Sequence, residues 1–367
     1  MGFDFAQKYT LTEALAQIKP AKAEAAEAAR ARWNSLAKPL YSLGLLEEAV
    51  CRAAAAQGSA DVKLDKPALV IMCADNGVVA EGVSQVGQEV TATVTENFVR
   101  HATSVAIMSA KAGVDIFPVD IGVNHEFPQA VYDKGLINRK LAWGTKNMVQ
   151  EPAMSQAEAV QAIEVGINLA AALVSQGYNV LATGEMGIGN TTTSSAILAV
   201  LLHEPVEKMT GIGSGLTRAG IKRKQEVIAR AIELHRPNPQ EPLAVLAALG
   251  GLDIAGLVGV FLGGALCGAP VLIDGVISGA AALLAQRLCP AAADYMVASH
   301  CSKEPSGQLI LQALGQRPII QADMCLGEGT GAVAVLPVLQ LALSVYDEMR
   351  TFQETDIEDY NDLVEKC

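Results

Sequence analysis

Positive charge is scarce in this sequence. The 367 residues include 27 Lys and Arg against 39 Asp and Glu, so the formal net charge is −12. Nucleic acids and anionic membranes bind surfaces on which Lys and Arg are concentrated. We therefore expect neither as a partner, while a local site for a small anion is compatible with this balance.

Aromatic residues are also few, at 4% of the chain, whereas hydrophobic residues make up 51%. The apolar content therefore comes mostly from Ala, Val, Leu and Ile, and 33 Gly accompany it. Such a composition disfavours long disorder and favours helices packed closely on a sheet. The length suits one large α/β domain with additions.

Disulfide and metal-site patterns are missing. The seven cysteines form no CxxC pair, and an odd number in a long chain fits reduced thiols better than a disulfide or zinc framework. The five histidines show no HExxH or other ligand spacing. We expect no metal, no cofactor and a cytoplasmic location, because Asp4 precedes any apolar run and the N-terminus therefore predicts no signal peptide.

Only residues 254–273 form an uncharged stretch of membrane length. We do not interpret it as a membrane span, because it contains five Gly and Pro270 and lies between Asp253 and Asp274. The segment Cys-Gly-Ala-Pro at 267–270 divides it into a helix of small residues and a buried strand.

The chain changes character near residue 60. Before that point, Ala, Glu, Lys and Arg predict three helices, at residues 12–18, 22–33 and 43–57. From Pro67 onward, short apolar runs that end in Gly, Asp or Ser alternate with longer helical patterns. This alternation predicts a parallel sheet with helical crossovers. The expected strands are residues 68–72, 114–119, 180–182, 271–273, 295–298 and 319–322.

Two of the expected helices carry clear boundary signals. Ser155 and Glu158 have the spacing of a capping box before an Ala-rich run at 159–172. Pro242 suits the first position of a helix that ends before Gly250. The acidic residues 354–365 suit either a solvated end helix or a frayed terminus.

Ligands of open α/β sheets bind beyond the carboxyl ends of the strands. There this chain carries GEMGIGNTTTS (184–194), which leads into an apolar helix. It is neither a Walker loop nor a dinucleotide fingerprint, because the Lys and the third glycine are absent. A turn of this kind is as often a structural cap as an anion site, and a second Gly-rich turn at 211–215 shifts the balance modestly toward an anion site.

Two acidic residues lie in glycine settings, Glu328 in GEGTG and Glu185 in GEMG. Shielded from water, Glu328 would suit a general base, while the simpler alternative is a helix N-terminal Glu that favours the macrodipole. Lys224 belongs either to a solvated face or to a phosphate site. A buried thiol is the simpler interpretation of Cys301, with a nucleophile as the alternative. Residues 191–195 lack a G-x-S-x-G elbow, which disfavours a hydrolase.

Taken in order, ADNGVVAEGVS, GEMGIGNTT, GGLDIAG, PVLIDG, SHCS and LGEGTGA resemble the nicotinate-nucleotide:dimethylbenzimidazole phosphoribosyltransferase family, over roughly residues 35–345. The resemblance implies a Rossmann-like parallel sheet of about six strands with helices on both faces. It also implies a small helical domain from both chain ends, here residues 1–60 with about 345–367, beside a large domain at 61–344. Members of the family act as dimers without a metal and transfer the phosphoribosyl group of nicotinate mononucleotide to an aromatic base.

The resemblance also assigns site residues. Glu328 matches the catalytic base, and Glu185 matches a carboxylate near the ribose and the reacting centre. The residues implied for the phosphate and ribose are Gly187, Ile188, Gly189, Asn190, Thr191, Gly213, Lys224, Ser302 and Gly327. Those expected in the acceptor pocket are Val86, Gln88, Val94 and Leu326.

The chain departs from the family pattern at KPLYSLG (38–44), where KPPGSLG is usual, and at Val86 and Val94, where benzimidazole-using members are expected to carry Ser and Gln. An apolar pocket suits a phenolic acceptor such as phenol or p-cresol, with dimethylbenzimidazole as the alternative. The simpler alternative is that these apolar residues have no role in binding. Val90, Val94 and Phe98 recur at every fourth position, so they would form the buried face of one helix.

Homodimers and heterodimers of homologous subunits both fit the resemblance. In a heterodimer, this chain would be either the transferase or a nucleotide-binding partner without turnover, and the presence of both Glu185 and Glu328 argues against the latter. A hydrolase that releases ribose phosphate is a third alternative, distinguished by nicotinate release without any acceptor.

Overall fold

The computed structural model describes residues 5–213 and 215–358. Residues 1–4, on which the expectation about a signal peptide depends, lie outside this part. So do residues 359–367, which belong to the predicted small domain and to the acidic C-terminal segment.

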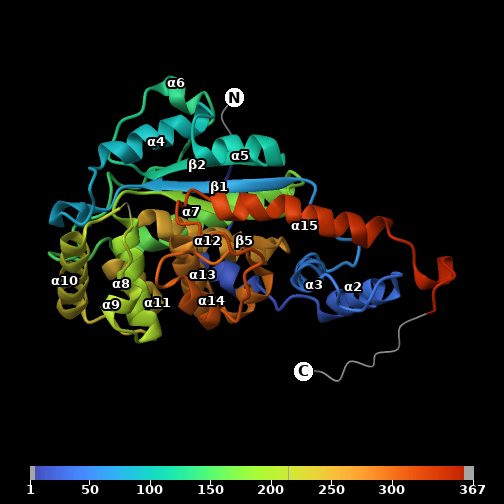
Figure 1. The fold of residues 1–367 in the computed structure, drawn as a ribbon. Coiled ribbons are helices and arrows are strands. Elements are labelled where there is room, and N and C mark those ends of the chain that lie inside the picture. The colour runs from blue at the N-terminus through green and yellow to red at the C-terminus, as the bar shows by residue number, and fades with distance from the viewer. Residues whose placement is uncertain (1–4, 214, 359–367) are drawn as a thin grey trace.

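The centre of the molecule is a sheet of six parallel strands in the order β3-β2-β1-β4-β5-β6 (Figure 1). The order reverses between β1 and β4, and at such a point the loops beyond the carboxyl ends separate and leave a crevice for ligands. This confirms the predicted Rossmann-like α/β fold. The strands are β1 (Pro67–Ala74), β2 (Asp115–Gly122), β3 (Ile137–Asn138), β4 (Val180–Met186), β5 (Val271–Ile273) and β6 (Met296–Ala298).

One expected strand is wrong. Residues 319–322 form a single bridge between His300 and Ile320 instead of a strand. Pro318 has no N–H to donate, and residues 321–323 are exposed, so the pairing does not extend. The sixth strand is β3, whose two residues pair with β2 and are too few to produce a sequence pattern.

Helices cover both faces of the sheet, as predicted. Every residue of β1 is buried, and its side chains alternate between two clusters. Val70 and Met72 pack toward α7 (Gln156–Ser175), α8 (Asn190–Leu202), α12 (Leu252–Cys267) and α13 (Val276–Leu288). Leu69 and Ile71 pack toward α4 (Glu89–Val99), α5 (Ser104–Ala112) and α15 (Thr330–Glu348).

The boundary signals in the sequence are confirmed. Glu158 N donates to Ser155 Oγ at 3.1 Å, and Ser155 N donates to Glu158 Oε2 at 2.8 Å, which completes the capping box of α7. Pro242 begins α11 (Pro242–Leu249), and Gly250 ends it. The remaining elements are α6 (Gln129–Tyr132), α9 (Val206–Met209), α10 (Arg218–His235), α14 (Gly307–Ala313) and the short 3-10 helices η1 (Gly77–Glu81), η2 (Pro290–Tyr295) and η3 (Phe352–Glu354).

The uncharged stretch at 254–273 divides as expected, into the buried helix α12 and the strand β5. Among the described residues, α7 and α15 are the helices long and apolar enough to cross a membrane by length and composition. Each has 56% of its most apolar window buried inside the protein. As core helices do, α15 packs on β4 and α7 packs on α12.

The first three helices are α1 (Leu11–Gln17), α2 (Ala23–Ser35) and α3 (Leu45–Gln57), close to their predicted bounds. α2 lies beside the end of α15, where the rings of Trp33 and Tyr346 meet at 5.0 Å between centroids. α1 instead packs on α7 and α12, through Leu11 and Ala14. The division into two domains stays a prediction.

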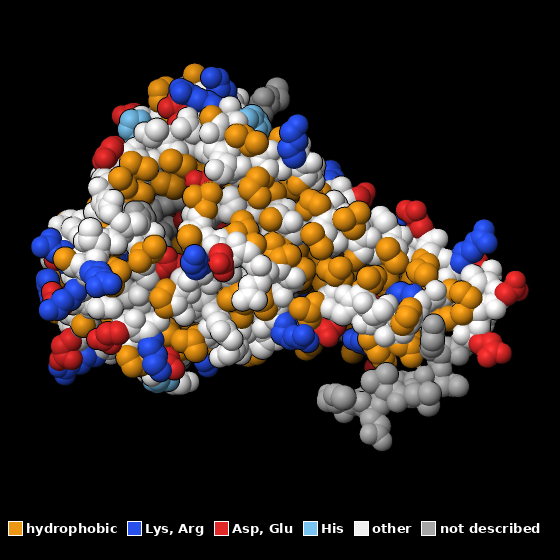
Figure 2. Space-filling view, viewed as in Figure 1, with side chains coloured by type: hydrophobic (Ala, Val, Ile, Leu, Met, Phe, Trp, Pro, Cys, Tyr) orange, Lys and Arg blue, Asp and Glu red, His pale blue; other side chains and the backbone are white. Residues whose placement is uncertain are grey.

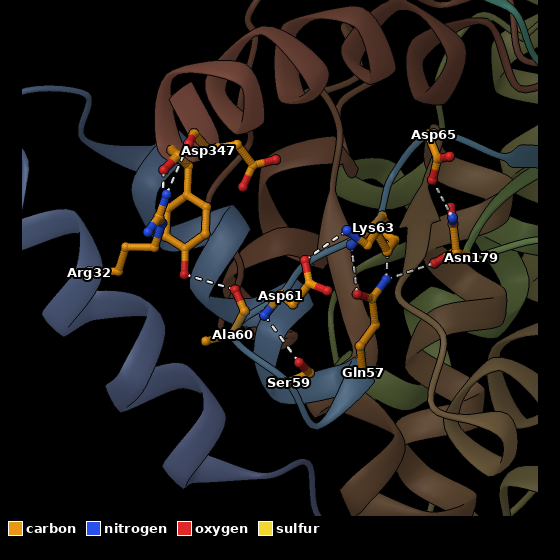
Figure 3. Close-up of polar contacts among 10 residues, drawn as sticks. Arg32, Gln57, Ser59, Ala60, Asp61, Lys63, Asp65, Asn179 and Asp347 are labelled. Atoms are coloured by element: carbon orange, nitrogen blue, oxygen red, sulfur yellow. Dashed lines mark hydrogen bonds and ion pairs between the residues drawn. The ribbon is translucent and has the colours of Figure 1, made fainter. Parts of the chain in front are cut away.

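Polar contacts fasten the connection between α3 and β1 (Figure 3). Gln57 Nε2 donates to the carbonyls of Lys63 and Asn179, at 2.7 and 3.1 Å. Tyr346 Oη donates to the carbonyl of Ala60 at 2.9 Å, and Arg32 donates to the carbonyls near the end of α15. These bonds join α2 and the α3–β1 connection to the end of α15.

Candidate active site

A cavity of about 360 Å³ lies at the carboxyl end of β4, beside the point where the strand order reverses. Figure 2 shows a hollow on the left side of the molecule, between α4 and α10, with acidic atoms visible inside it. Most of the residues predicted from the sequence line this cavity. They are Glu185, Gly187, Ile188, Gly189, Asn190, Thr191, Gly213, Lys224, Ser302, Gly327 and Glu328, with Val94 and Leu326 from the expected acceptor pocket.

Two predicted pocket residues are not among the lining residues. Val86 lies in the loop before α4 with 39% of its surface exposed, and its N–H donates to Ser84 Oγ. Gln88 Nε2 donates to the carbonyl of Asn76, and its Oε1 accepts from Asn124. The placement of Val86 and Gln88 beside the acceptor therefore stays a prediction.

Glu185 is the penultimate residue of β4 and is buried, with 7% of its surface exposed. Asn190 Nδ2, in the first turn of α8, donates to Glu185 Oε2 and to Asp253 Oδ2, the latter at 3.0 Å. Asp253 lies at the start of α12 and is completely buried. One amide group thus connects two buried carboxyl groups.

Burial raises the pKa of Glu185 to about 8, and the nearby charge of Asp253 acts in the same direction. The hydrogen bond from Asn190 opposes this shift. Burial likewise raises the pKa of Asp253 to about 7. Burial thus favours the protonated form of both carboxyl groups, and a positive charge beside them would favour their ionisation.

Glu328 has a strained backbone, with φ of 61° between Gly327 and Gly329, whose φ values are 85° and 92°. Residues other than glycine rarely adopt this conformation, and it persists where the surroundings impose it. The strand β4 lies directly against the Glu328 loop, because a Cβ added to Gly184 would lie 2.4 Å from the carbonyl oxygen of Glu328. Only glycine fits at position 184.

The Glu328 carboxylate faces the cavity with one oxygen uncommitted. Its Oε2 is buried and has no hydrogen-bond partner within the described residues. Burial raises the pKa of Glu328, while the backbone N–H of Val105 opposes the rise. A carboxylate that is partly shielded and free to accept a proton is what a general base requires.

Another part of the cavity lining carries a buried cation. Lys224 in α10 is fully buried, and its Nζ donates to Thr191 Oγ1 at 2.8 Å. Burial lowers its pKa to about 8, although Glu304 opposes the shift. Glu304 also accepts from the N–H of Gly213 at 3.2 Å.

The N-terminus of α8 opens onto the same wall, since Gly189, Asn190 and Thr191 line the cavity. Free N–H groups and the helix dipole attract anions at such a terminus. Together with Lys224, this end of the cavity is suited to a phosphate group.

The third wall is apolar. It consists of Val90 and Val94 from α4 together with Met186, Ile188 and Leu326. Thr91 Oγ1, fully buried, accepts from the N–H of Ile188 at 3.0 Å and holds the GEMGI loop against α4. The expected helical stripe therefore divides, because Phe98 belongs to the core whereas Val90 and Val94 face the cavity.

Comparisons with known proteins identify the family of this chain. A sequence-family model described as phosphoribosyltransferase matches residues 18–357. The chain is 44% identical over 354 residues to the nicotinate-nucleotide–dimethylbenzimidazole phosphoribosyltransferase of Ruminiclostridium cellulolyticum, which covers 96% of this chain and 99% of that relative. It is 46% identical over 347 residues to the protein of the same name from Chloroflexus aggregans, with 95% and 98% covered.

The chain belongs to the nicotinate-nucleotide–dimethylbenzimidazole phosphoribosyltransferase family. Solved structures agree: the crystal structure of CobT from Thermus thermophilus superposes with a TM-score of 0.86 at 40% identity, covering 92% of this chain and 100% of that one. The resemblance seen in the sequence motifs is confirmed, and the enzyme is a pentosyltransferase.

Several residues that line the cavity were not predicted from the sequence. Asp274 and His300 follow β5 and β6, so the rule that ligands bind beyond strand ends does identify them. Glu304 lies in a loop without a motif, and no sequence signal marks it. Cys301 does not line the cavity, and burial raises the pKa of its thiol, which disfavours the nucleophile interpretation.

Proposed function

We propose that this enzyme transfers the phosphoribosyl group of nicotinate mononucleotide to an aromatic acceptor and releases nicotinate. The main support for the proposal is that a single cavity combines cationic, acidic and apolar groups on different parts of its wall. A buried cation and a helix N-terminus suit the phosphate, two carboxyl groups suit the reacting centre, and an apolar face suits an aromatic ring.

In the proposed reaction, Glu328 is the general base. The acceptor attacks C1 of the ribose from the face opposite nicotinate, so the new bond forms as the bond from C1 to the pyridinium nitrogen breaks. The acceptor loses its proton to Glu328, and the pyridinium nitrogen keeps the bonding electrons. Since the leaving group is already cationic, positioning and one base are sufficient for the chemistry.

Glu185 is proposed to face the ribose and the positive charge beside it. Its carboxyl group is buried, so its ionised form has little water to stabilise it. The cationic pyridinium of the donor would supply that stabilisation. Donor binding and ionisation of Glu185 are therefore expected to favour one another.

The phosphate of the donor is proposed to bind Lys224 with the residues of the GEMGIGNT turn. Gly187, Ile188, Gly189, Asn190 and Thr191 provide the turn, and Gly213, Ser302 and Gly327 complete the wall around it. Lys224 is the buried cation of this cavity, and its partner Thr191 keeps the ammonium directed toward the start of α8.

Two acceptor classes are proposed. The names of the relatives favour dimethylbenzimidazole as the first. The apolar wall of Val90, Val94 and Leu326 favours phenols such as p-cresol as the second, because it offers no side-chain partner for a further ring nitrogen. Equimolar dimethylbenzimidazole and p-cresol in one reaction, with the two α-riboside phosphates separated by mass, would rank them directly.

We further propose that the enzyme acts as a dimer, either of two identical chains or with a homologous subunit. Apolar side chains gather over α5 and α15 on the face shown in Figure 2. Ile107 in α5 and Leu341 in α15 have 56% and 69% of their surfaces exposed. Light scattering on wild type and on Leu341→Asp tests this face, and a monomeric wild type that is fully active contradicts the proposal.

The alternative is a nucleotide-binding subunit without turnover. Retention of both Glu185 and Glu328 in the cavity supports the catalytic form. Nicotinate release by the purified chain in the presence of an acceptor separates the two, since a binding subunit releases none.

A further inference from the structure

Asp274 occupies an unusual place beneath the loop that carries Glu328. It follows β5, has only 4% of its surface exposed, and accepts three backbone hydrogen bonds from the start of α15. Gly331 N donates to its Oδ1 at 2.7 Å, Ala332 N donates to the same oxygen at 3.1 Å, and Gly329 N donates to Oδ2 at 3.2 Å.

These bonds hold the part of the loop that most needs support. Glu328 has a left-handed backbone that its side chain disfavours, and Gly329, the next residue, is one of the three donors. A negative carboxylate at the N-terminus of α15 also matches the helix dipole. Asp274 therefore fixes the backbone on one side of Glu328.

The other side of Glu328 is fixed as well. Its own N–H donates to Glu185, and Gly184 lies directly under its carbonyl oxygen. Asp274 is itself held in position, because its N–H donates to Ser278 Oγ at 3.1 Å and Ser278 is hydrogen-bonded to Thr183 of β4. A chain of contacts thus runs from the central strand through Asp274 to the loop.

We propose that Asp274 is a positioning residue for Glu328, which through the amides of Gly329, Gly331 and Ala332 sets the direction in which the Glu328 carboxylate faces the acceptor. This inference rests on the proposed role of Glu328 as the base. Asp274 lines the same cavity, but both of its oxygens are engaged by the loop, so it acts on the reaction through the backbone and not by contact with substrate.

The test compares Asp274→Asn with Asp274→Ala. The Asn side chain keeps the oxygen that accepts from Gly331 and Ala332 and loses only the bond from Gly329, whereas Ala loses all three. We expect kcat to fall by about 10-fold for Asn and by about 100-fold for Ala, with KM for nicotinate mononucleotide changed by less than about threefold, because a misplaced base affects turnover more than ground-state binding.

Hydrogen–deuterium exchange over residues 326–335 supplies a readout that does not depend on activity. Amide protection in this segment is expected to decrease slightly for Asn and strongly for Ala. Ser155→Ala is the matched control, because it removes a helix cap of the same kind from α7, outside the cavity-lining residues. That variant should leave both kcat and exchange in 326–335 unchanged.

Equal losses of kcat in Asn and Ala, with exchange unchanged, would show that the charge of Asp274 matters and that its three hydrogen bonds do not, and the proposal would be wrong. Wild-type kcat in the Asn variant together with wild-type exchange would also overturn it. If the Ala variant does not fold, the Asn variant alone decides by these criteria. Full activity of Glu328→Gln would instead remove the proposed base, while the exchange data would still report on the loop.

Discussion

The backbone N–H of Glu328 donates to Oε1 of Glu185 over 3.4 Å, so the two acidic residues of the cavity are linked directly although 143 positions separate them in the chain. Glu185 comes from the end of the central strand β4, and Glu328 comes from the loop before α15. A rigid strand therefore locates one carboxyl group and, through it, the backbone of the other.

Substituting Glu328→Gln removes the proposed base and keeps the shape of the side chain and its backbone bond to Glu185. We expect kcat to fall by about 10²–10⁴-fold, the range that a general base contributes, while nicotinate mononucleotide still binds. Steady-state kinetics with calorimetric binding measures both. Glu96→Gln, at a half-buried position of α4 outside the cavity-lining residues, is the matched control and should behave as wild type. Turnover of Glu328→Gln within about threefold of wild type would rule out the base.

The raised pKa of Glu185 predicts how stability depends on pH. In the folded protein its pKa is about 8, above the ordinary value of 4.5, so between these values the folded state binds more protons than the unfolded state. Its contribution to stability is therefore complete below pH 4.5 and is lost as the pH rises toward 8. The slope for one such group is at most about 1.4 kcal/mol per pH unit.

Glu185→Gln isolates this effect, because the amide cannot ionise. Melting temperatures of wild type and variant, measured from about pH 5 to about pH 8 without substrate, should differ increasingly in favour of the variant as the pH rises. A difference that stays constant over this range would contradict the buried, proton-binding state assigned to Glu185. Groups that do not interact with Glu185 titrate equally in both proteins and cancel in the comparison.

Lys224→Met tests the phosphate wall. A hydrogen bond to a charged group contributes about 1.5–3 kcal/mol, so we expect Kd for nicotinate mononucleotide to rise by about 10- to 100-fold. Nicotinate riboside, which has no phosphate, should bind both proteins alike. The exposed neighbour Lys222→Met is the control and should leave both affinities unchanged. Equal weakening of nucleotide and riboside would place the phosphate elsewhere.

Gly184→Ala tests the close contact between β4 and the Glu328 loop. The new Cβ would lie 2.4 Å from the carbonyl oxygen of Glu328, so the loop must shift. We expect a loss of about 1–3 kcal/mol in the free energy of unfolding, as for other overpacked sites, together with reduced kcat. At Gly275 a Cβ meets nothing within 4 Å, so Gly275→Ala should unfold at nearly the wild-type denaturant concentration. Comparable stability of both variants would contradict the packing described.

The fold and most of the site follow from sequence patterns for physical reasons. The strands β1 and β4 are buried on both faces, and β1 is a continuous apolar run while β4 begins as one. The end of β4 and the turn after it carry Glu185, the glycines and Asn190 that the cavity uses. The side chains of the third wall are harder to assign. Val86 and Gln88 adjoin the start of α4 but are not among the cavity-lining residues, so their place in the acceptor pocket stays a prediction.

Other features arise only from tertiary structure. Asp274, which supports the Glu328 loop, is a strand-end residue in the sequence, and its three donors come from a segment more than fifty residues later. The shared amide between Glu185 and Asp253 likewise joins β4, α8 and α12. No local pattern predicts such contacts, because they depend on how separate elements pack.

The most direct test of the proposed function incubates the purified chain with nicotinate mononucleotide and, separately, dimethylbenzimidazole, p-cresol or phenol, and follows nicotinate and the α-riboside phosphate by mass spectrometry. We predict equal amounts of the two products with at least one acceptor, no nicotinate release without an acceptor, and loss of both products in Glu328→Gln. Nicotinate released without any acceptor, or no product with any of the three, would contradict the account.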